Sequence, residues 1–147
     1  MASSNGERES VVSFPSPYFF SGNVHLEARA EKSVIQFGNN VQMNNNFVAI
    51  ALRNIQIGNN VMIGTNVEMI DNDGHNLDPA KRRTSIVNSM DILIGDNVWI
   101  GSNVKILKGV KIGQNSVVSN GAVVTKSFAK DVVIGGIPAK VIKSIYD

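Results

Sequence analysis

A six-residue period is the feature of this sequence that most constrains its fold. Written in sixes from Ile57, the chain reads IGNNVM, IGTNVE and MIDNDG. From Ile94 it reads IGDNVW, IGSNVK, ILKGVK, IGQNSV, VSNGAV and VTKSFA. A period of six fits neither an α-helix nor a simple alternating β-strand. It fits a short extended segment followed by a turn, repeated without helices.

Three such segments, about eighteen residues, close one coil of a parallel β-solenoid. We therefore predict an all-β fold in which the apolar residue that opens each block points inward and stacks on its equivalents in neighbouring coils. Asn and Gly tolerate a positive φ angle. Their recurrence in the repeat predicts the turn positions, which are Asn40, Asn60, Asn66, Asn97, Asn103, Asn115, Gly109 and Gly121.

The repeat also predicts the organisation of the chain. We expect residues 1–21 to be a flexible N-terminal segment and residues 22–147 to form one domain of about four to five coils. An open solenoid end exposes unpaired backbone groups, so it needs a cover. We expect residues 130–147 to supply it as a strand, a turn at Gly135 and Gly136, and a short C-terminal helix.

The period fails once, between Met69 and Ile94. Residues 71–91 read DNDGHNLDPAKRRTSIVNSMD and are dense in Gly, Pro, Asp and Asn, which predicts one protruding loop. Long loops on a regular scaffold often carry binding and catalytic residues. His75 lies in this loop, and an imidazole with its ordinary pKa of about 6.5 can act as a base at neutral pH.

Composition excludes several classes of function. The chain has no cysteine and a net charge of +2, which excludes disulfides and thiolate chemistry and disfavours general nucleic-acid binding. No stretch is long and apolar enough to span a membrane, and the N-terminus lacks a secretion signal, so we expect a cytoplasmic protein. Two histidines are too few for a three-histidine zinc site, and we expect no metal requirement.

The run IGDNVWIGSNVKILKGVKIGQNSVVSNGAVVTKSFAKDVVIGGIPAKVIKSI resembles the C-terminal half of the hexapeptide-repeat acetyltransferases, whose fold is a left-handed parallel β-helix. The most similar branch contains the maltose and galactoside O-acetyltransferases and the polysaccharide-biosynthesis acetyltransferases. DNDGHNLDPAKR resembles the active-site loop of that branch. The resemblance covers roughly Gly38 to Ile145.

The resemblance implies a homotrimer that binds acetyl-coenzyme A as co-substrate in clefts between subunits. It implies that His75 is the catalytic base and that an asparagine lies near it, for which Asn44 is the best match and Asn45 and Asn46 are the alternatives. It also implies that backbone N–H groups of Gly101 and Ser102 lie near the thioester. It also implies a coenzyme site, which we expect to include Trp99, Ser119, Asn120, Thr125, Lys126, Lys140 and Lys143. One departure is notable, because this chain has Ser119-Asn120-Gly121 where the family usually has a small Gly-Ala or Ala-Gly pair.

The acceptor is less constrained. Asp71 and Asp73 flank His75 and are turn residues, orient the imidazole, or contact the acceptor, while Arg82 binds an acidic acceptor or is simply solvated. By resemblance we expect acetyl transfer to a hydroxyl or amine of a saccharide, possibly nucleotide-linked and used in cell-surface polysaccharide synthesis. Without a cysteine, we expect direct attack rather than a covalent acyl-enzyme. The alternatives are a xenobiotic or antibiotic O-acetyltransferase and a non-enzymatic β-solenoid scaffold.

Overall fold

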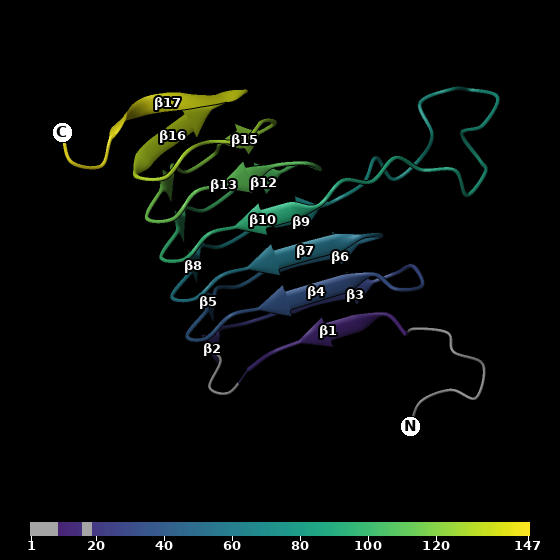
Figure 1. Ribbon diagram of the computed structural model, residues 1–147, viewed down its shortest axis with the longest axis horizontal. Coiled ribbons are helices and arrows are strands. Elements are labelled where there is room, and N and C mark those ends of the chain that lie inside the picture. Colours follow the sequence, from purple (N-terminus) through teal and green to yellow (C-terminus); the bar gives the residue numbers. More distant parts are fainter. Residues whose placement is uncertain (1–8, 16–18) are drawn as a thin grey trace.

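The computed structural model describes residues 9–15 and 19–147, which form a parallel β-solenoid of five turns. Each turn contributes one strand to each of three sheets, which we call A, B and C, so that equivalent strands lie one above another (Figure 1). The chain runs from sheet A to sheet B to sheet C and back to A. We call the short connections between the sheets the A–B, B–C and C–A edges. This architecture confirms the predicted all-β solenoid.

The strands of each sheet follow the order of the turns. Sheet A contains β1 (Val11–Ser13), β4 (Val34–Phe37), β7 (Asn54–Ile57), β10 (Ile92–Ile94) and β13 (Lys111–Ile112). Sheet B contains β2 (Phe19–Phe20), β5 (Gln42–Met43), β8 (Met62–Ile63), β11 (Trp99–Ile100), β14 (Val117–Val118), β16 (Val132–Gly136) and β17 (Ala139–Ser144). Sheet C contains β3 (Val24–Ala28), β6 (Phe47–Ala51), β9 (Glu68–Ile70), β12 (Lys105–Ile106) and β15 (Val123–Val124).

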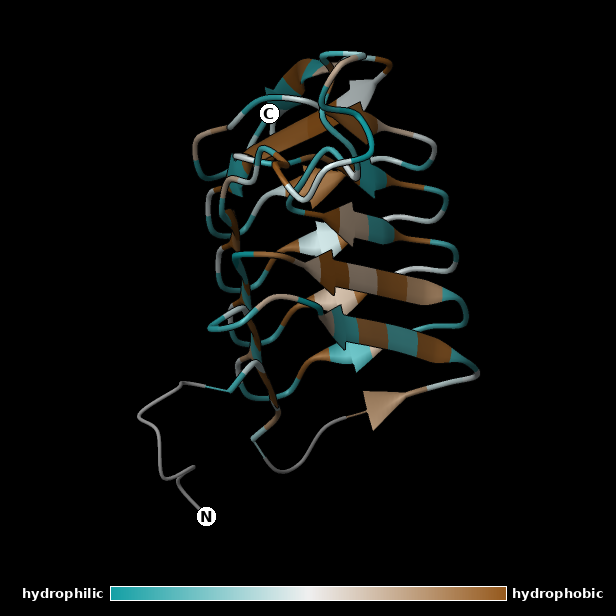
Figure 2. Cartoon of the chain, turned by 90° about the vertical axis from the view of Figure 1, so that its right-hand side faces the viewer, coloured by the Kyte–Doolittle hydropathy of each residue, from teal (hydrophilic) through white to brown (hydrophobic). Residues whose placement is uncertain are grey.

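The core consists of apolar side chains stacked in register along the solenoid axis. In sheet A, Ile57, Ile94 and Ile112 are paired in successive turns, and each is buried. Apolar and polar residues alternate along the longer strands, as the bands of colour in Figure 2 show. Burying one such aliphatic side chain stabilises the fold by about 1.5–3 kcal/mol. The predicted inward stacking is confirmed.

Ladders of asparagine side chains stabilise the connections at the edges of the solenoid. All eight predicted turn residues have a positive φ, between 56° and 80°. At the A–B edge the Asn97 side-chain amide donates to Asn115 Oδ1 (3.1 Å), and that of Asn115 donates to Asp131 Oδ1 (2.8 Å). The asparagines therefore serve two purposes, since they adopt the left-handed backbone conformation and bond one turn to the next.

The predicted C-terminal helix is wrong. Residues 139–144 form strand β17, which pairs antiparallel with β16 and places Gly136 opposite Ala139 and Val132 opposite Ser144. The pairing supplies partners to backbone groups along the outer edge of β16, which a helix would leave unpaired. The turn between these strands runs through Ile137 and Pro138, just beyond its predicted position. No helix among the described residues is long and apolar enough to cross a membrane.

Part of the N-terminal segment belongs to the solenoid. Within residues 1–21, β1 pairs with β4 and β2 pairs with β5, so that together with β3 they complete the first turn of the solenoid. The Phe14 ring stacks on the Phe37 ring, with 4.6 Å between centroids. Residues 1–8 and 16–18 lie outside the described part of the chain.

Candidate active site

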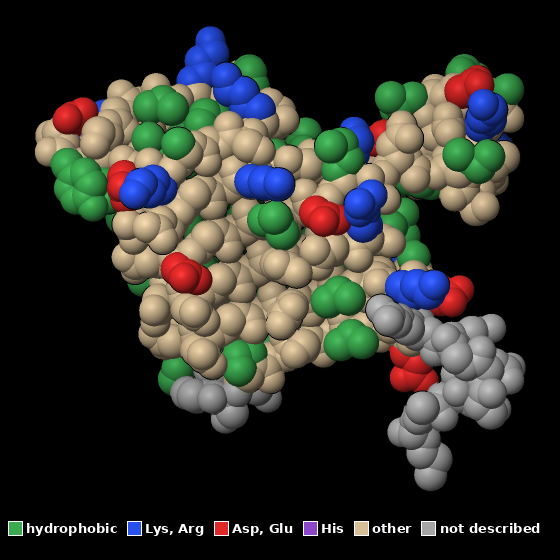
Figure 3. Space-filling model, viewed as in Figure 1, with side chains coloured by type: hydrophobic (Ala, Val, Ile, Leu, Met, Phe, Trp, Pro, Cys, Tyr) green, Lys and Arg blue, Asp and Glu red, His purple; other side chains and the backbone are tan. Residues whose placement is uncertain are grey.

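Residues 71–91 leave the prism at the C–A edge, between β9 and β10, and stand away from its body (Figures 1 and 3). The two ends of the loop pair as a short ribbon: the Asp73 N–H donates to the Asn88 carbonyl (3.1 Å), and the Met90 N–H donates to the Asp71 carbonyl (2.9 Å). Farther out, the side chain of Leu77 is 72% exposed.

His75 is exposed, and the backbone holds its ring. Its Nδ1 lies 3.2 Å from the Arg82 carbonyl oxygen. A carbonyl only accepts hydrogen bonds, so this contact requires the proton on Nδ1 and leaves the lone pair on Nε2. Nε2 is thus the atom that can take a proton from a substrate. The Arg82 guanidinium donates to the Leu77 carbonyl (3.0 Å), so both ends of Arg82 help to fold the loop.

Of the three roles left open for Asp71, the structure favours that of a turn residue. Asp71 is fully buried at the start of the loop. Its Oδ1 accepts the Leu52 N–H (2.8 Å), and its Oδ2 accepts the N–H groups of Arg53 (2.8 Å) and Asn54 (2.7 Å). A carboxylate with both oxygens occupied inside the fold cannot reach a substrate. Asp71 instead ties the start of the loop to the preceding turn.

Asp73 lies in a different environment. One of its oxygens pairs with Lys108 Nζ at 2.7 Å, while Oδ2 is buried and has no hydrogen-bond partner among the described residues. Asp73 lines a cleft of about 230 Å³ together with Glu68 and Gly74, the neighbour of His75. Sequence analysis missed Lys108. The register of β12 on β9 could have found it, because that pairing places residue 108 one turn above residue 71.

A second set of predicted residues lies along the B–C edge. Gly101 with Ser102 lie there two turns above Asn44, and Ser119 with Asn120 lie one turn above Gly101 and Ser102. Asn44 is exposed, and its Nδ2 donates to the Ile63 carbonyl (3.2 Å), which leaves its Oδ1 without a partner among the described residues. The solenoid therefore aligns positions that are 57 to 76 residues apart in sequence.

The predicted oxyanion donors at this edge are already hydrogen-bonded. The Gly101 N–H donates to the Val118 carbonyl (2.8 Å), and the Ser102 N–H donates to Asn120 Oδ1 (2.8 Å). The prediction assumed that both groups would face a substrate. In the structure the Gly101 N–H belongs to the solenoid backbone, and its role near the thioester stays a prediction. The Ser102 N–H is held only by a side chain.

One chain does not bring the two sets together. Each strand of sheet C starts at the B–C edge and ends at the C–A edge. Asn44 and Ser102 precede strands of this sheet, whereas His75 follows one, so they lie at opposite edges of sheet C. A site that uses all three residues requires a second chain.

The sequence and the fold have known counterparts. Residues 91–126 match the family described as bacterial transferase hexapeptide (six repeats). The chain is 37% identical to the galactoside O-acetyltransferase of Escherichia coli K12 over 134 residues, which cover 90% of this chain and 60% of that protein. A maltose O-acetyltransferase from Clostridium difficile 630 superposes with a TM-score of 0.75 at 33% identity, covering 92% of this chain and 68% of that one.

A hexapeptide-repeat acetyltransferase from Vibrio cholerae O1 biovar eltor, in complex with acetyl-coenzyme A, superposes with a TM-score of 0.71 at 31% identity. The match covers 95% of this chain and 70% of that one. The chain belongs to the hexapeptide-repeat acetyltransferase family. Within it, the chain is similar to the galactoside and maltose O-acetyltransferases, as the resemblance implied.

This member of the hexapeptide-repeat family spans only part of its curated relatives. The chain covers 53–61% of the length of the five that match it over three quarters or more of its own length. The similarity to these relatives is therefore a similarity over part of their length, which in this chain corresponds to the solenoid and its loop.

The expected coenzyme residues of this family member are spread over two edges and one sheet. Trp99 is 53% exposed on sheet B, between Met62 and Val117 of the neighbouring turns. Thr125 and Lys126 follow β15 at the C–A edge, where Lys126 Nζ lies 5.7 Å from the centre of the Phe128 ring.

The other two expected phosphate-binding lysines lie on β17. Lys140 is opposite Gly135, and Gly135 separates it from Ser119 at the B–C edge. Lys143 Nζ donates to the main-chain oxygen of Asp147 (3.1 Å). Within one chain, the three lysines 126, 140 and 143 do not form one cluster. Their predicted role in phosphate binding stays a prediction.

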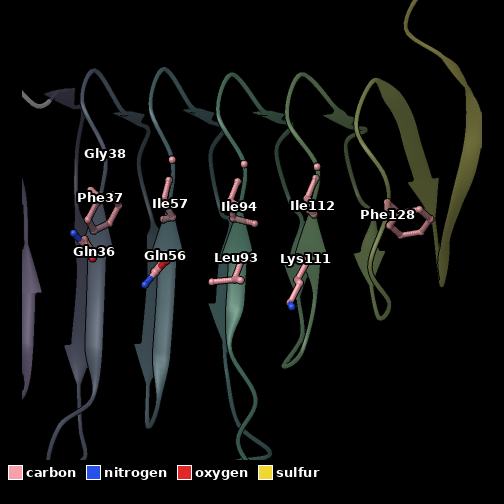
Figure 4. Close-up of a pocket in the computed structure, with 13 residues that line it drawn as sticks. Gln36, Phe37, Gly38, Gln56, Ile57, Leu93, Ile94, Lys111, Ile112 and Phe128 are labelled. Carbon is pink, nitrogen blue, oxygen red and sulfur yellow. The ribbon is translucent and has the colours of Figure 1, made fainter.

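A long groove on sheet A is lined by none of the predicted site residues. It has a volume of about 450 Å³ and crosses the turns beside the A–B edge (Figure 4). Its floor is a column of glycines where an added β-carbon would come within 2.3–2.7 Å of the next turn, namely Gly38, Gly58, Gly95 and Gly113. Lys111 is its one ionisable lining residue. The groove follows from close stacking of the turns.

The second histidine belongs to a surface ion-pair cluster. On β3, His25 Nε2 lies 2.6 Å from Glu27 Oε1, and Arg29 Nε bonds the other Glu27 oxygen. Hydrogen bonds from Arg29 first, and from His25 second, lower the pKa of the Glu27 carboxyl. His25 therefore lies outside the candidate site.

Proposed function

We propose that this protein transfers the acetyl group of acetyl-coenzyme A to a hydroxyl group of a sugar. The observation that carries the proposal is the loop histidine of a hexapeptide-repeat acetyltransferase whose Nδ1 is held by a backbone carbonyl. That contact fixes the tautomer with a free lone pair on Nε2, which is what a general base needs. The similarity to galactoside and maltose O-acetyltransferases supports a sugar as the acceptor.

The active site in this proposal lies between two chains of a homotrimer. The loop of one chain carries His75 to the B–C edge of its neighbour, where Asn44 and Ser102 lie. Two features of the single chain support this arrangement. The two sets of residues lie at opposite edges of sheet C, and the loop presents the apolar side chains of Leu77 and Ile86 outside the prism. A neighbouring chain would cover them.

The chemistry then follows in two steps. His75 Nε2 takes the proton of the sugar hydroxyl while the hydroxyl oxygen attacks the carbonyl carbon of the thioester. A C–O bond forms and the C–S bond breaks, and the imidazolium returns the proton to the departing thiolate of coenzyme A. The Asn44 Oδ1 of the neighbouring chain is free to accept a hydrogen bond that orients the acceptor. Placing both substrates together supplies much of the rate enhancement.

Asp73 is the proposed acceptor-binding residue of the loop. Asp73 lines the cleft beside Gly74, and its Oδ2 lacks a partner among the described residues. Sugar hydroxyls are hydrogen-bond donors, and a carboxylate is a strong acceptor for them.

The proposal is tested by a panel of acceptors incubated with acetyl-coenzyme A, with release of the free thiol as the signal. The panel includes galactosides, maltose, free monosaccharides, nucleotide-linked sugars and a hydroxylated antibiotic. We expect thiol release to require a sugar and to yield an O-acetyl ester, which mild base removes. Thiol release with none of the sugars, or a base-stable amide as the product, would contradict the proposal.

A further inference from the structure

The side chain of Asn120 accepts a hydrogen bond from a backbone N–H at the B–C edge. Its Oδ1 accepts the Ser102 N–H at 2.8 Å and lies over Gly101, where an added β-carbon would be 2.4 Å from the same oxygen. Asn120 is exposed, and its Nδ2 has no hydrogen-bond partner in the described part of the chain. One hydrogen bond therefore holds this amide in place.

Three other donors at this edge are bound to the main chain instead. The N–H groups of Gly101, Ser119 and Gly121 all donate to main-chain carbonyls of neighbouring turns, at 2.8–2.9 Å. Those bonds cannot open without pulling turns of the solenoid apart. The Ser102 N–H, like the Thr65 N–H that donates to Ser102 Oγ (3.1 Å), is held by a side chain. Rotating the exposed Asn120 side chain releases the Ser102 N–H for a ligand.

We propose that Asn120 sets the affinity of this enzyme for acetyl-coenzyme A by competing with the thioester oxygen for the Ser102 N–H. The inference rests on the proposed function. An amide oxygen and a thioester oxygen are both neutral carbonyl acceptors, so one replaces the other with little change in chemistry. Free coenzyme A has no carbonyl at its sulfur and gains nothing from this donor.

The competition has a measurable consequence. A ligand that needs a released donor binds with an apparent dissociation constant raised by the inverse of the released fraction. A neutral hydrogen bond of ordinary strength makes this factor about three- to tenfold. Asn120 thereby weakens acetyl-coenzyme A selectively and leaves the product, coenzyme A, unaffected.

The test is calorimetric titration of acetyl-coenzyme A and of coenzyme A, without acceptor, into the wild type and two variants. We expect Asn120→Ala to bind acetyl-coenzyme A about three- to tenfold more tightly and coenzyme A unchanged. We expect Asn120→Asp to shift the ratio of the two constants the other way, because a carboxylate holds the N–H more strongly. The ratio cancels any effect of the added charge on both ligands.

Asn59 supplies a matched control at the A–B edge. Its Oδ1 accepts the Asn39 N–H at 2.7 Å and lies over Gly38, where an added β-carbon would be 2.5 Å away. Asn59→Ala removes the same kind of bond from an edge outside the proposed site. We expect it to lower the melting temperature as much as Asn120→Ala does and to leave the ratio of the two affinities unchanged.

Three results would overturn the inference. An unchanged affinity ratio in Asn120→Ala would mean that its side chain does not compete with the thioester. Weaker binding of acetyl-coenzyme A by that variant would mean that the side chain contacts the substrate instead. If the wild type bound neither ligand, the proposed function would fail, and this inference with it.

Discussion

Asp71 and His75 lie close together in sequence, but the fold surrounds their side chains in opposite ways. Asp71 is buried, and both of its oxygens accept backbone N–H groups of the preceding turn. His75, four residues later, is exposed and is held through one ring nitrogen. The contrast shows how a regular solenoid can carry a reactive loop. The start of the loop is fixed rigidly to the scaffold, so that the outer part can be presented to another chain.

This contrast separates stability from activity, and the predictions test the separation. Substitutions at the start of the loop should unfold the protein more easily. Substitutions from Asp73 onward should change the chemistry and leave the melting temperature nearly constant.

The largest effect is expected at His75. Replacing it with Ala removes the proposed general base, and we expect the rate of thiol release to fall about 10²- to 10⁴-fold. The melting temperature should stay within error of the wild type, because the side chain is exposed. His25→Ala is the matched control and should retain full activity. Normal turnover by His75→Ala would remove this residue from the mechanism.

Asp71→Asn should cause the largest loss of stability. The NH2 group of the introduced asparagine would face the backbone N–H groups of Arg53 and Asn54, which donate to the carboxylate in the wild type. Leaving buried donors unsatisfied costs about 2–4 kcal/mol in the free energy of unfolding, which lowers the melting temperature by about 10 °C. Thermal unfolding followed by circular dichroism measures the change. A melting temperature within 2–3 °C of the wild type would show that the carboxylate is not essential to the fold.

Asp73→Asn should have a smaller structural effect, because its partner Lys108 is partly exposed. We expect a loss of under about 1 kcal/mol in stability. The Michaelis constant for the sugar should rise about tenfold as a charged hydrogen bond is weakened. The constant for acetyl-coenzyme A should not change. An equal rise for both substrates would argue against acceptor binding.

The smallest effect is expected at Glu27, on the surface of β3. Its pKa is lowered from 4.5 by Arg29 and His25, so its contribution to stability is present above that value and is lost as the pH falls through the lowered pKa. Glu27→Gln should therefore differ slightly from the wild type at pH 7 and not at all in strong acid. Melting temperatures measured across this range check the sign. A difference that grew toward low pH would contradict it.

Much of the fold was predictable because each repeat carries its own turn signal. Asn97 and Asn115 specify a left-handed turn by themselves, and Ile94 and Ile112 specify the side that faces the core. The C-terminal strand was not predictable in this way. Residues 139–144 lie outside the repeat, and their conformation is set by the free edge of β16, which only the assembled sheet reveals.

The candidate site was predictable to a different degree. His75 could be proposed from its place in a loop that interrupts the repeat. Local sequence could not distinguish Asp71 from Asp73, because burial depends on the turn that packs beneath each of them. Nor could it show that the Ser102 N–H is occupied by Asn120, since that bond joins successive turns of the solenoid.

The central claim is that His75 of one chain acts with Asn44 of another, and subunit mixing tests it most directly. His75→Ala and Asn44→Ala are each expected to be nearly inactive as pure proteins. When they are unfolded together in equal amounts and refolded, about a quarter of the intersubunit sites in a cyclic trimer should contain both wild-type residues. The account predicts recovery of about that fraction of wild-type activity. If the mixture stayed as inactive as its components, although mixed trimers had formed, the site would lie within one chain and the account would be wrong.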